Sequence, residues 1–300
     1  MRVVSIGELL WDVFEDFEQL AGAPLNFAVD MRRLGHEVDF VSAVGNDHRG
    51  QDALRLLDQY GLSTDFVRRV DDQPTGYVDV TVSDDGEPTW RIRRPAAYDS
   101  SSLSSEELDE IASHDPQWIY YGTAHQMSSA AKELTGRLVA RFPSARRFYD
   151  MNLRKDCFSR ELVGEILERA SILKLNEEEA RESCDLLGGG FRDLESFCSW
   201  ASDRFDLEGV CVTRGKHGCM ARVGEEWIES PGFEVTVKDT GGSGDAFAAG
   251  FLHGLDQGWA LAKVCEFANR LGALIATKEG ALPQWSTDEL KAISTPRASG

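Results

Sequence analysis

Asp239-Thr240-Gly241-Gly242-Ser243-Gly244-Asp245-Ala246-Phe247 is the stretch that decides how the rest of this chain is interpreted. It follows a run of alternating apolar residues, 233–237, which predicts a strand, and it opens an apolar run that predicts a helix over 244–256. A strand followed by a glycine-rich turn and a helix leaves backbone N–H groups unpaired where the helix dipole is positive. The stretch therefore predicts an anion-binding site, and Gly242 and Gly244 leave room for a phosphate to approach the backbone.

Asp245 is unusual in such a turn, because a carboxylate repels a phosphate. Its presence fits a group that takes a proton from a hydroxyl while that hydroxyl attacks a phosphoryl group. The alternative is a structural acid that caps the first turn of the helix. The common nucleotide motifs do not match. A P-loop needs Ser or Thr after its Lys, but His follows Lys216, and a dinucleotide fingerprint needs a third glycine after Gly244.

The stretch resembles the C-terminal signature of the PfkB (ribokinase-like) sugar kinases, Asp-Thr-x-Gly-Ala/Ser-Gly-Asp-Ala-Phe, and all the fixed positions match. In that family the turn forms the anion hole and its last Asp is the catalytic base. The resemblance implies these roles for Gly242, Ser243 and Gly244 and for Asp245. It also implies a ribokinase-like α/β fold, a mostly parallel sheet with helices on both faces and a small β-sheet lid, with ATP and Mg²⁺ as cofactors.

The composition is that of a soluble globular protein. The chain has 300 residues, 42% hydrophobic and 28% charged, and no apolar run approaches the roughly 20 residues that span a bilayer. The first residues include too short an apolar run for a signal peptide, so we expect a cytoplasmic protein. A formal charge of −19 argues against nucleic acid and anionic membranes as partners. The six cysteines lack metal-ligand spacing and predict buried free thiols.

The remaining sequence alternates strand-like and helix-like segments, which favours parallel strands with helices on both faces of the sheet. The predicted strands are 3–6, 38–44, 117–121, 146–150, 171–175 and 209–213. The first predicted helix begins near residue 24 and is ended by Gly35. The other predicted helices are 49–60, 128–141, 160–170, 176–187, 193–204, 244–256, 259–277 and 287–293. An antiparallel flap is expected at 217–223 and 226–229.

Residues 75–94 interrupt this alternation. Their apolar and polar residues alternate around a turn at 84–86, and this pattern predicts a β-hairpin with one polar face. We interpret the hairpin, together with residues 10–20, as a small β-sheet lid. The expected organisation is a single kinase domain, 1–300, with the lid inserted at about 10–20 and 73–97.

The family resemblance extends to a segment near the N-terminus. Gly22-Ala23-Pro24-Leu25-Asn26 lies where a helix is predicted to begin, and the residues alone indicate a proline in the first turn and an Asn near the cap. The segment is most similar to that of fructokinases, although residue 21 is Ala where the family usually has Gly. The resemblance implies that Gly22 and Asn26 bind sugar hydroxyls and that Asp12 lines the opposite wall.

Two other segments are candidates for contacts with the sugar and the phosphate. Arg91 and Arg94 precede a Pro-Ala-Ala segment; hairpin arginines are usually solvated, but in fructokinase-like proteins an Arg near this segment reaches the sugar. Asp150-Met151-Asn152-Leu153-Arg154 ends a strand, where parallel sheets gather ligands. The resemblance implies that Asn152 contacts substrate or phosphate and that Arg154 neutralises the transferring phosphoryl group. The alternative is an ordinary strand-end turn.

The segment 174–179, Lys-Leu-Asn-Glu-Glu-Glu, also ends a strand and begins a helix. The spacing of Asn176 and Glu179 predicts a capping box. It also matches the family's Asn-x-x-Glu motif, which implies that Glu179 acts on Mg²⁺ through water and that Lys174 and Asn176 lie on the ATP side. Both interpretations are compatible, because Mg²⁺ keeps several waters and needs few carboxylates.

The rest of the nucleotide site is expected from the resemblance alone. The residues it aligns with ATP are Thr213, Gly215, Gly218 and Asn269. The family often binds a monovalent cation such as K⁺ beside the anion hole, and Asp239 is the candidate ligand for it.

These matches run in family order from Gly7 to about Gly280. They imply ATP-dependent phosphorylation of a sugar hydroxyl, most similar to fructokinase. The acceptor could instead be 2-keto-3-deoxygluconate, ribose or a nucleoside. A different class, a non-catalytic sugar or nucleotide sensor, is disfavoured because a sensor has no use for Asp245. The hairpin at 75–94 could cover its own site or pair edges with a second copy, and we expect a homodimer through the lid.

Overall fold

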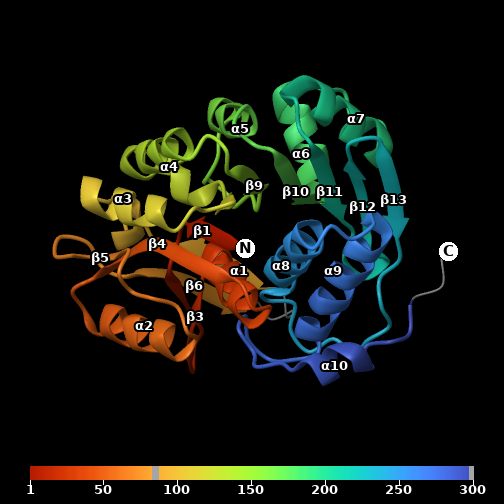
Figure 1. Ribbon diagram of the computed structural model, residues 1–300. Helices are drawn as coiled ribbons and strands as arrows, with labels where there is room; N and C mark the ends of the chain where they lie inside the picture. Colours follow the sequence, from red (N-terminus) through yellow and green to blue (C-terminus); the bar gives the residue numbers. More distant parts are fainter. Residues whose placement is uncertain (83–87, 297–300) are drawn as a thin grey trace.

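The computed structural model describes residues 1–82 and 88–296, which form a large sheet, helices on both of its faces and a second, small sheet (Figure 1). Within these residues the large sheet has nine strands in the order β13-β12-β11-β10-β9-β8-β1-β4-β5. Their bounds are β1 (Arg2–Ile6), β4 (Glu37–Gly45), β5 (Val67–Val70), β8 (Trp118–Tyr121), β9 (Arg146–Asp150), β10 (Ile172–Asn176), β11 (Gly209–Thr213), β12 (Cys219–Val223) and β13 (Glu226–Ser230). Neighbours from β5 to β11 are parallel, and β12 and β13 are antiparallel.

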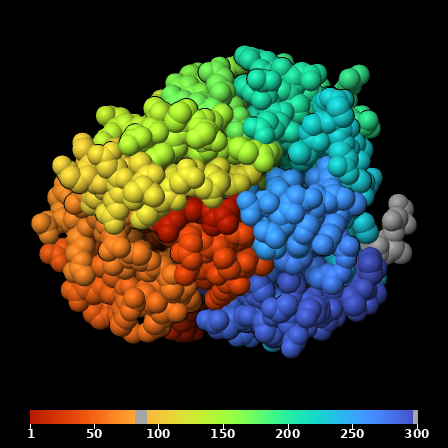
Figure 2. Space-filling view, viewed as in Figure 1, coloured from red at the N-terminus to blue at the C-terminus, as the bar shows by residue number. Residues whose placement is uncertain are grey.

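The helices divide between the two faces of this sheet (Figure 1). One face carries α3 (Ser105–Ser113), α4 (Ser129–Arg141), α5 (Arg160–Leu167), α6 (Glu177–Leu187) and α7 (Leu194–Phe205). The other carries α1 (Ala23–Arg33), α2 (His48–Gln59), α8 (Ser243–Asp256) and α9 (Leu261–Ala276), and α10 (Thr287–Ala292) packs on α9. In the space-filling view the first part of the chain, in red and orange, borders the part that contains α8 and α9, in blue (Figure 2). Segments from opposite ends of the sequence therefore meet.

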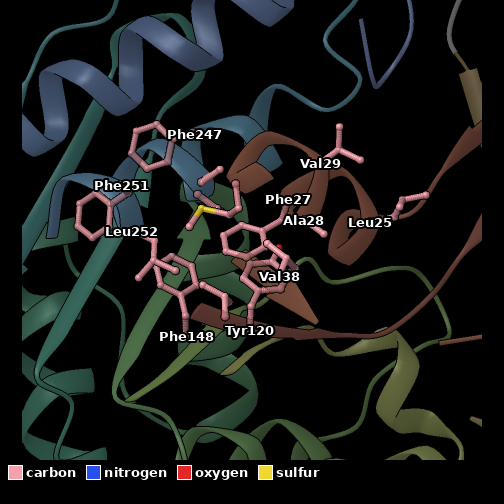
Figure 3. Close-up of a cluster of buried hydrophobic side chains, with 14 of the residues drawn as sticks. Leu25, Phe27, Ala28, Val29, Val38, Tyr120, Phe148, Phe247, Phe251 and Leu252 are labelled. Atoms are coloured by element: carbon pink, nitrogen blue, oxygen red, sulfur yellow. The ribbon is translucent and has the colours of Figure 1, made fainter. Parts of the chain in front are cut away.

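The core explains why the strands are apolar throughout. Successive strand residues point to opposite faces, so Tyr120 packs under α1 and α8 while the next residue, Tyr121, packs under the helices of the other face. Figure 3 shows the first of these clusters, in which Phe27 of α1 stacks on Tyr120 with ring centroids 3.8 Å apart. Phe148 of β9 and Phe251 of α8 continue the cluster. A parallel sheet covered on both faces needs this composition.

The small sheet consists of β2 (Leu10–Val13), β3 (Glu18–Ala21), β6 (Gly76–Val82) and β7 (Pro88–Ile92), in the order β3-β2-β6-β7. The predicted fold class, a mostly parallel α/β sheet with a separate small β-sheet, is confirmed. The turn predicted at 84–86 lies outside the described residues.

The strand predicted at 233–237 is wrong. Only Phe233 forms an isolated bridge, with Pro296, and the side chain of Val237 is 55% exposed. Among the described residues no strand lies beside the segment, and its backbone instead bonds at one point, Glu234 N–H to the carbonyl of Thr295 (3.0 Å). The expected flap is present as β12 and β13, but it extends the edge of the large sheet because β12 pairs with β11.

Two elements, β5 and α3, were not predicted. The short Val-Arg-Arg-Val sequence of β5 gives little periodicity, whereas α3 has a recognisable start, because Ser104 and Glu107 form a capping box. The six cysteines are buried and free, as predicted. Among the described residues, none of the helices is long and apolar enough to cross a membrane.

Candidate active site

The glycine turn before α8 presents unpaired backbone N–H groups. Those of Gly242, Gly244 and Asp245 make no hydrogen bond within the described part of the chain, whereas that of Ser243 donates to the carbonyl of Thr240 (3.2 Å). Gly242 has a φ of 73°, and a Cβ there would lie 2.1 Å from the carbonyl oxygen of Ala281, so only glycine fits. The turn therefore offers three N–H donors to an anion at the start of α8, and the amide of Ser243 is already in use.

Asp245 lies in the first turn of α8 and accepts a hydrogen bond from the side-chain amide of Asn26 (Nδ2 to Oδ2, 2.7 Å). Within the described residues no backbone N–H donates to the Asp245 carboxylate, so Asp245 does not cap the helix. Burial and the nearby charge of Asp150 raise the pKa of Asp245 to about 7, although Lys174 and the Asn26 bond oppose the rise. A carboxyl group with this pKa can accept and release a proton at neutral pH.

A buried ion pair lies next to this carboxylate. Nζ of Lys174, on β10, is 3.0 Å from both carboxylate oxygens of Asp150, at the end of β9, and the hydroxyl of Tyr120 donates to one of them (2.9 Å). Burial lowers the pKa of Lys174, but the charges of Asp150 and Asp245 more than offset this and raise it. A Cβ on Gly244 would lie 3.3 Å from Nζ, so the charged ammonium faces the glycine turn. The sequence reveals this pair only once β9 and β10 are known to be neighbours.

Glu179 is held on both of its oxygens by backbone N–H groups. Oε2 accepts from Asn176 (2.8 Å) and Oε1 from Leu153 (2.7 Å), while Asn176 Oδ1 accepts from the N–H of Glu179 (2.8 Å). The predicted capping box is confirmed, and the same carboxylate ties α6 to the loop after β9. The described residues contain no group of three or more acids, His or Cys that could hold a metal ion. This donor set fits a Mg²⁺ bound mainly by nucleotide phosphates and water.

The opposite wall of the site comes from the small sheet. Asp12 on β2 pairs across the strands with Gln19 on β3, whose side chain hydrogen-bonds its carboxylate. Burial raises the pKa of Asp12 to about 6, against the lowering effects of Arg154 and of the Gln19 bond. Gln19 was not predicted as a site residue, because its place beside Asp12 depends on the register of β2 and β3.

The candidate arginines differ in whether their side chains already have hydrogen-bond or ion-pair partners within the protein. Arg94 donates to the carbonyl of Ala124 (2.6 Å) and forms an ion pair with Asp99, while Arg91 is exposed on β7. The side chain of Arg154 makes no hydrogen bond or ion pair with any residue that the structure describes, although its backbone carbonyl accepts from the N–H of Cys157 (2.9 Å).

Arg154 nevertheless lies close enough to the carboxylates of Glu8, Asp12 and Asp245 to lower the pKa of each. Its guanidinium is thus a free positive charge between the glycine turn and the small sheet. Asn152, two residues earlier, turns the chain here with a left-handed φ of 42°.

Glu8, like Gln19, lies at the site although no sequence motif indicated it. It lies between β1 and β2 with 7% of its surface exposed, and its Oε2 atom is buried without a hydrogen-bond partner. Its backbone also explains Gly22, since a Cβ on Gly22 would lie 2.3 Å from the Glu8 carbonyl oxygen. Gly22 is therefore required by chain packing, whatever else it contacts.

The residues expected along the nucleotide lie around the ends of β11 and β12. Thr213 donates to the carbonyl of Leu175 (3.3 Å), and Gly215 has open space around its Cα. Gly218 is packed, because a Cβ there would lie 2.1 Å from the carbonyl oxygen of Ser230. The amide of Asn269 donates to that same bend, to the carbonyl oxygens of Ser230 (3.4 Å) and Pro231 (3.2 Å). Among the described residues, no hydrogen bond or ion pair joins this group to Asp245.

Asp239 ties the glycine turn to the C-terminal part of the chain. Its Oδ1 accepts from the N–H of Gly241 (2.8 Å) and its Oδ2 from that of Gly280 (3.0 Å). The expected cation ligand thus has a structural task in the turn.

Comparisons with known proteins identify the family and the fold of this chain. The model of the pfkB family of carbohydrate kinases matches residues 7–288. The chain is 30% identical to a fructokinase of Salmonella typhimurium, over 94% of this chain and 95% of the relative. It is 27% identical to an ATP-dependent ribose-1-phosphate kinase of Halopiger xanaduensis, over 99% of both chains. The structure of a fructokinase with bound ATP from Xylella fastidiosa superposes with a TM-score of 0.84 at 23% identity, over 97% of both chains.

Proposed function

The chain belongs to the pfkB family of carbohydrate kinases, and from this premise we propose that it transfers the γ-phosphate of ATP to a hydroxyl group of fructose. The observation that carries this proposal is the site at the start of α8. There the carboxylate of Asp245, with a pKa of about 7, adjoins three unpaired N–H groups and the ammonium of Lys174. A base next to an anion site is what phosphoryl transfer to an alcohol requires.

In the proposed reaction the acceptor hydroxyl gives its proton to Asp245 while its oxygen bonds to the γ-phosphorus. The bond from that phosphorus to the β,γ-bridging oxygen breaks, and ADP leaves with the electron pair. The N–H groups of Gly242, Gly244 and Asp245 hold the charge on the transferred group, as fixed donors in a preorganised site. Lys174 and the unpaired Arg154 add positive charge from two sides.

Asn26 has two tasks in this proposal. Its amide N–H₂ holds Asp245 in place, and its Oδ1 atom is buried without a partner. A sugar hydroxyl would supply the missing donor, which favours an acceptor bound between Asn26 and Asp12. Asn152, and Arg94 where it borders this pocket, remain proposed substrate contacts.

Mg²⁺ would neutralise the phosphates of bound ATP, with Glu179 and Asn176 orienting its water ligands. Thr213, Gly215, Gly218 and Asn269 are proposed to line the nucleotide. A monovalent cation such as K⁺ near Asp239 remains a prediction.

The choice of fructose rests on the Gly22-Ala23-Pro24 segment and on the fructokinases among the relatives. Ribose, a nucleoside and 2-keto-3-deoxygluconate are the alternatives, and the relative from Halopiger xanaduensis adds ribose 1-phosphate. A sugar or nucleotide sensor is the alternative of a different class.

An ADP-release assay with Mg²⁺ and ATP tests the proposal against fructose, ribose, glucose, ribose 1-phosphate, 2-keto-3-deoxygluconate and adenosine. We expect fructose to give the highest kcat/KM. A higher value for another acceptor would replace fructose, and ligand binding by calorimetry without any turnover would favour the sensor.

We also propose that two copies associate through the small sheet. Phe17, which follows β2, is 57% exposed and stacks on Phe14 with ring centroids 4.4 Å apart. Sedimentation at working concentration would contradict a dimer if it found only monomer.

A further inference from the structure

Glu8 is a buried acid that packs against Gly22, where the acceptor is proposed to bind, and we call this part of the site its acceptor end. Glu8 has no role in the proposed reaction. Its Oε2 atom has no hydrogen-bond partner among the residues that the structure describes, and only 7% of the residue is exposed. Native proteins rarely bury a carboxylate oxygen unpaired, because the lost hydration costs free energy. The residue therefore calls for an explanation that packing does not supply.

The charges around Glu8 provide one. Arg94 and Arg154 both lie close enough to lower its pKa, against the larger effect of burial, which raises it. Arg94 is already bound to Asp99 and to the carbonyl of Ala124. Its positive charge is therefore balanced before any ligand arrives.

Arg154 is the cation at this wall that has no ion pair within the described part of the chain. Three carboxyl groups share its charge, those of Glu8, Asp12 and Asp245. Lys174 does not add to this balance, because it is paired with Asp150. The acceptor end of the site therefore carries more carboxyl groups than free cations.

We propose that Glu8 sets the charge selectivity of the acceptor pocket: it adds a negative charge beside Arg154, so that the pocket accepts uncharged polyols and disfavours acceptors that carry a carboxylate or a phosphate. This inference rests on the proposed function, because it concerns the acceptor of that reaction. Glu8 acts through the charge of Arg154 and not by touching the reacting atoms, so it is a positioning residue.

Without Glu8 an anionic acceptor would meet one negative charge fewer beside Arg154. Partial solvation screens the interaction between unit charges at such a site. We therefore expect the selectivity to change by about tenfold, which corresponds to about 1.4 kcal/mol.

Glu8→Gln is the test, because it keeps the shape of the side chain and removes its charge. Two matched pairs of ligands serve as probes: ribose with ribose 1-phosphate, and fructose with 2-keto-3-deoxygluconate. For each pair, kcat/KM or the inhibition constant gives the preference for the neutral member. We expect this preference to fall about tenfold in Glu8→Gln, mainly through tighter binding of the anionic member. Glu8→Asp, which restores the charge, should recover the preference even if its turnover is lower.

Glu37→Gln is the matched control, since it removes the same charge at the start of β4, where the side chain is 61% exposed. It should leave the preference unchanged. If Glu8→Gln does not fold, Glu8→Met offers an apolar chain of similar length and carries the same expectation. An unchanged preference in the folded Glu8 variant would overturn the inference, and so would a wild-type protein that prefers the anionic member of both pairs.

Calorimetric binding of the same four ligands separates this inference from the proposed reaction. A wild-type protein that binds fructose or ribose without phosphorylating it would contradict the kinase proposal, and the binding preference would still decide the role of Glu8. A protein that binds none of the four ligands would overturn the inference as well.

Discussion

Helices α1 and α8 lie side by side and are joined by a side-chain hydrogen bond at each end (Figures 1 and 3). At their N-terminal ends Asn26 donates to Asp245 (2.7 Å). At their C-terminal ends His36, which follows α1, bonds to His253 in the last turn of α8 (Nε2 to Nδ1, 2.8 Å). The two bonds are alike in length, and the difference between them lies in their surroundings.

The N-terminal pair, Asn26 and Asp245, lies among charged groups, and the pKa of Asp245 is raised. Asp245 has a pKa of about 7 in place of 3.8, so the folded protein holds its proton more tightly than the unfolded chain does. Its contribution to the free energy of unfolding therefore decreases as the pH rises from about 4 to 7. A base suited to catalysis is thus maintained at some cost in stability.

The C-terminal pair, His36 and His253, lies among aromatic rings, and the pKa values of both histidines are lowered. Burial reduces the pKa of His36 from 6.5 to about 4, and His253 packs against Trp259 and Phe267. The unfolded chain binds more protons in this range, so the stability that the pair provides at neutral pH is lost as the pH falls from about 6.5 to 4. In the proposed reaction one end of the helix pair serves the chemistry, whereas the other end holds the helices together.

The largest expected effect tests the first half of this comparison. Asp245→Asn should lower kcat by about 10²-fold or more, since it removes the general base, while ATP still binds. The amide can still accept the bond from Asn26, so the melting temperature should not fall. Asp288→Asn, the same change at a side chain that is 97% exposed, is the control for turnover. Near-normal turnover in Asp245→Asn would remove Asp245 from its role.

The next effect tests the C-terminal pair, His36 and His253. His253→Ala leaves His36 without its partner and opens a cavity, and we expect a loss of about 2 kcal/mol in the free energy of unfolding, measured in urea. KM and kcat of the folded fraction should stay as in the wild type. His48→Ala, at a side chain that is 87% exposed, is the matched control and should leave stability unchanged. A fall in kcat without a fall in stability would show that the two ends do not have separate tasks.

The smallest effect sharpens the comparison through pH. In the wild type, kcat/KM should rise about tenfold per pH unit below an apparent pKa of about 7, because Asp245 must lose its proton to act as a base. Asn26→Ala removes a hydrogen bond that lowers the pKa of Asp245, so this limb should move to higher pH. Asn46→Ala, at an exposed amide that bonds to Asp71, should leave the limb in place. A limb that stays in place in Asn26→Ala, or moves to lower pH, would contradict the assignment.

The sequence was sufficient for features that depend on local pattern or on an unbroken motif. The alternating strands and helices, the glycine turn and the capping box of Asn176 and Glu179 all have short-range causes. The strand expected at 233–237 failed because alternation cannot reveal whether a neighbouring strand is available.

Features that depend on neighbours far apart in the chain were not predictable from one sequence. The Lys174–Asp150 pair requires the order of β9 and β10, and the two histidines require the packing of α1 on α8. Glu8 had no signal at all, because a buried acid after a strand looks like a solvated one. The bonds of Arg94 to Ala124 and Asp99 were not predictable either, because they depend on turns that were not predicted.

The separation of the Asn26–Asp245 pair has a consequence for the synthesis of the protein. The two residues lie 219 positions apart, and the turn that carries Asp245 also packs on Ala281 and is tied to Gly280 through Asp239. A nascent chain that has emerged as far as residue 230 can contain the strands of both sheets, but it has neither Asp245 nor the glycine turn. In the proposed reaction a growing polypeptide on the ribosome therefore cannot consume ATP, and catalysis begins only when almost the whole chain has been translated.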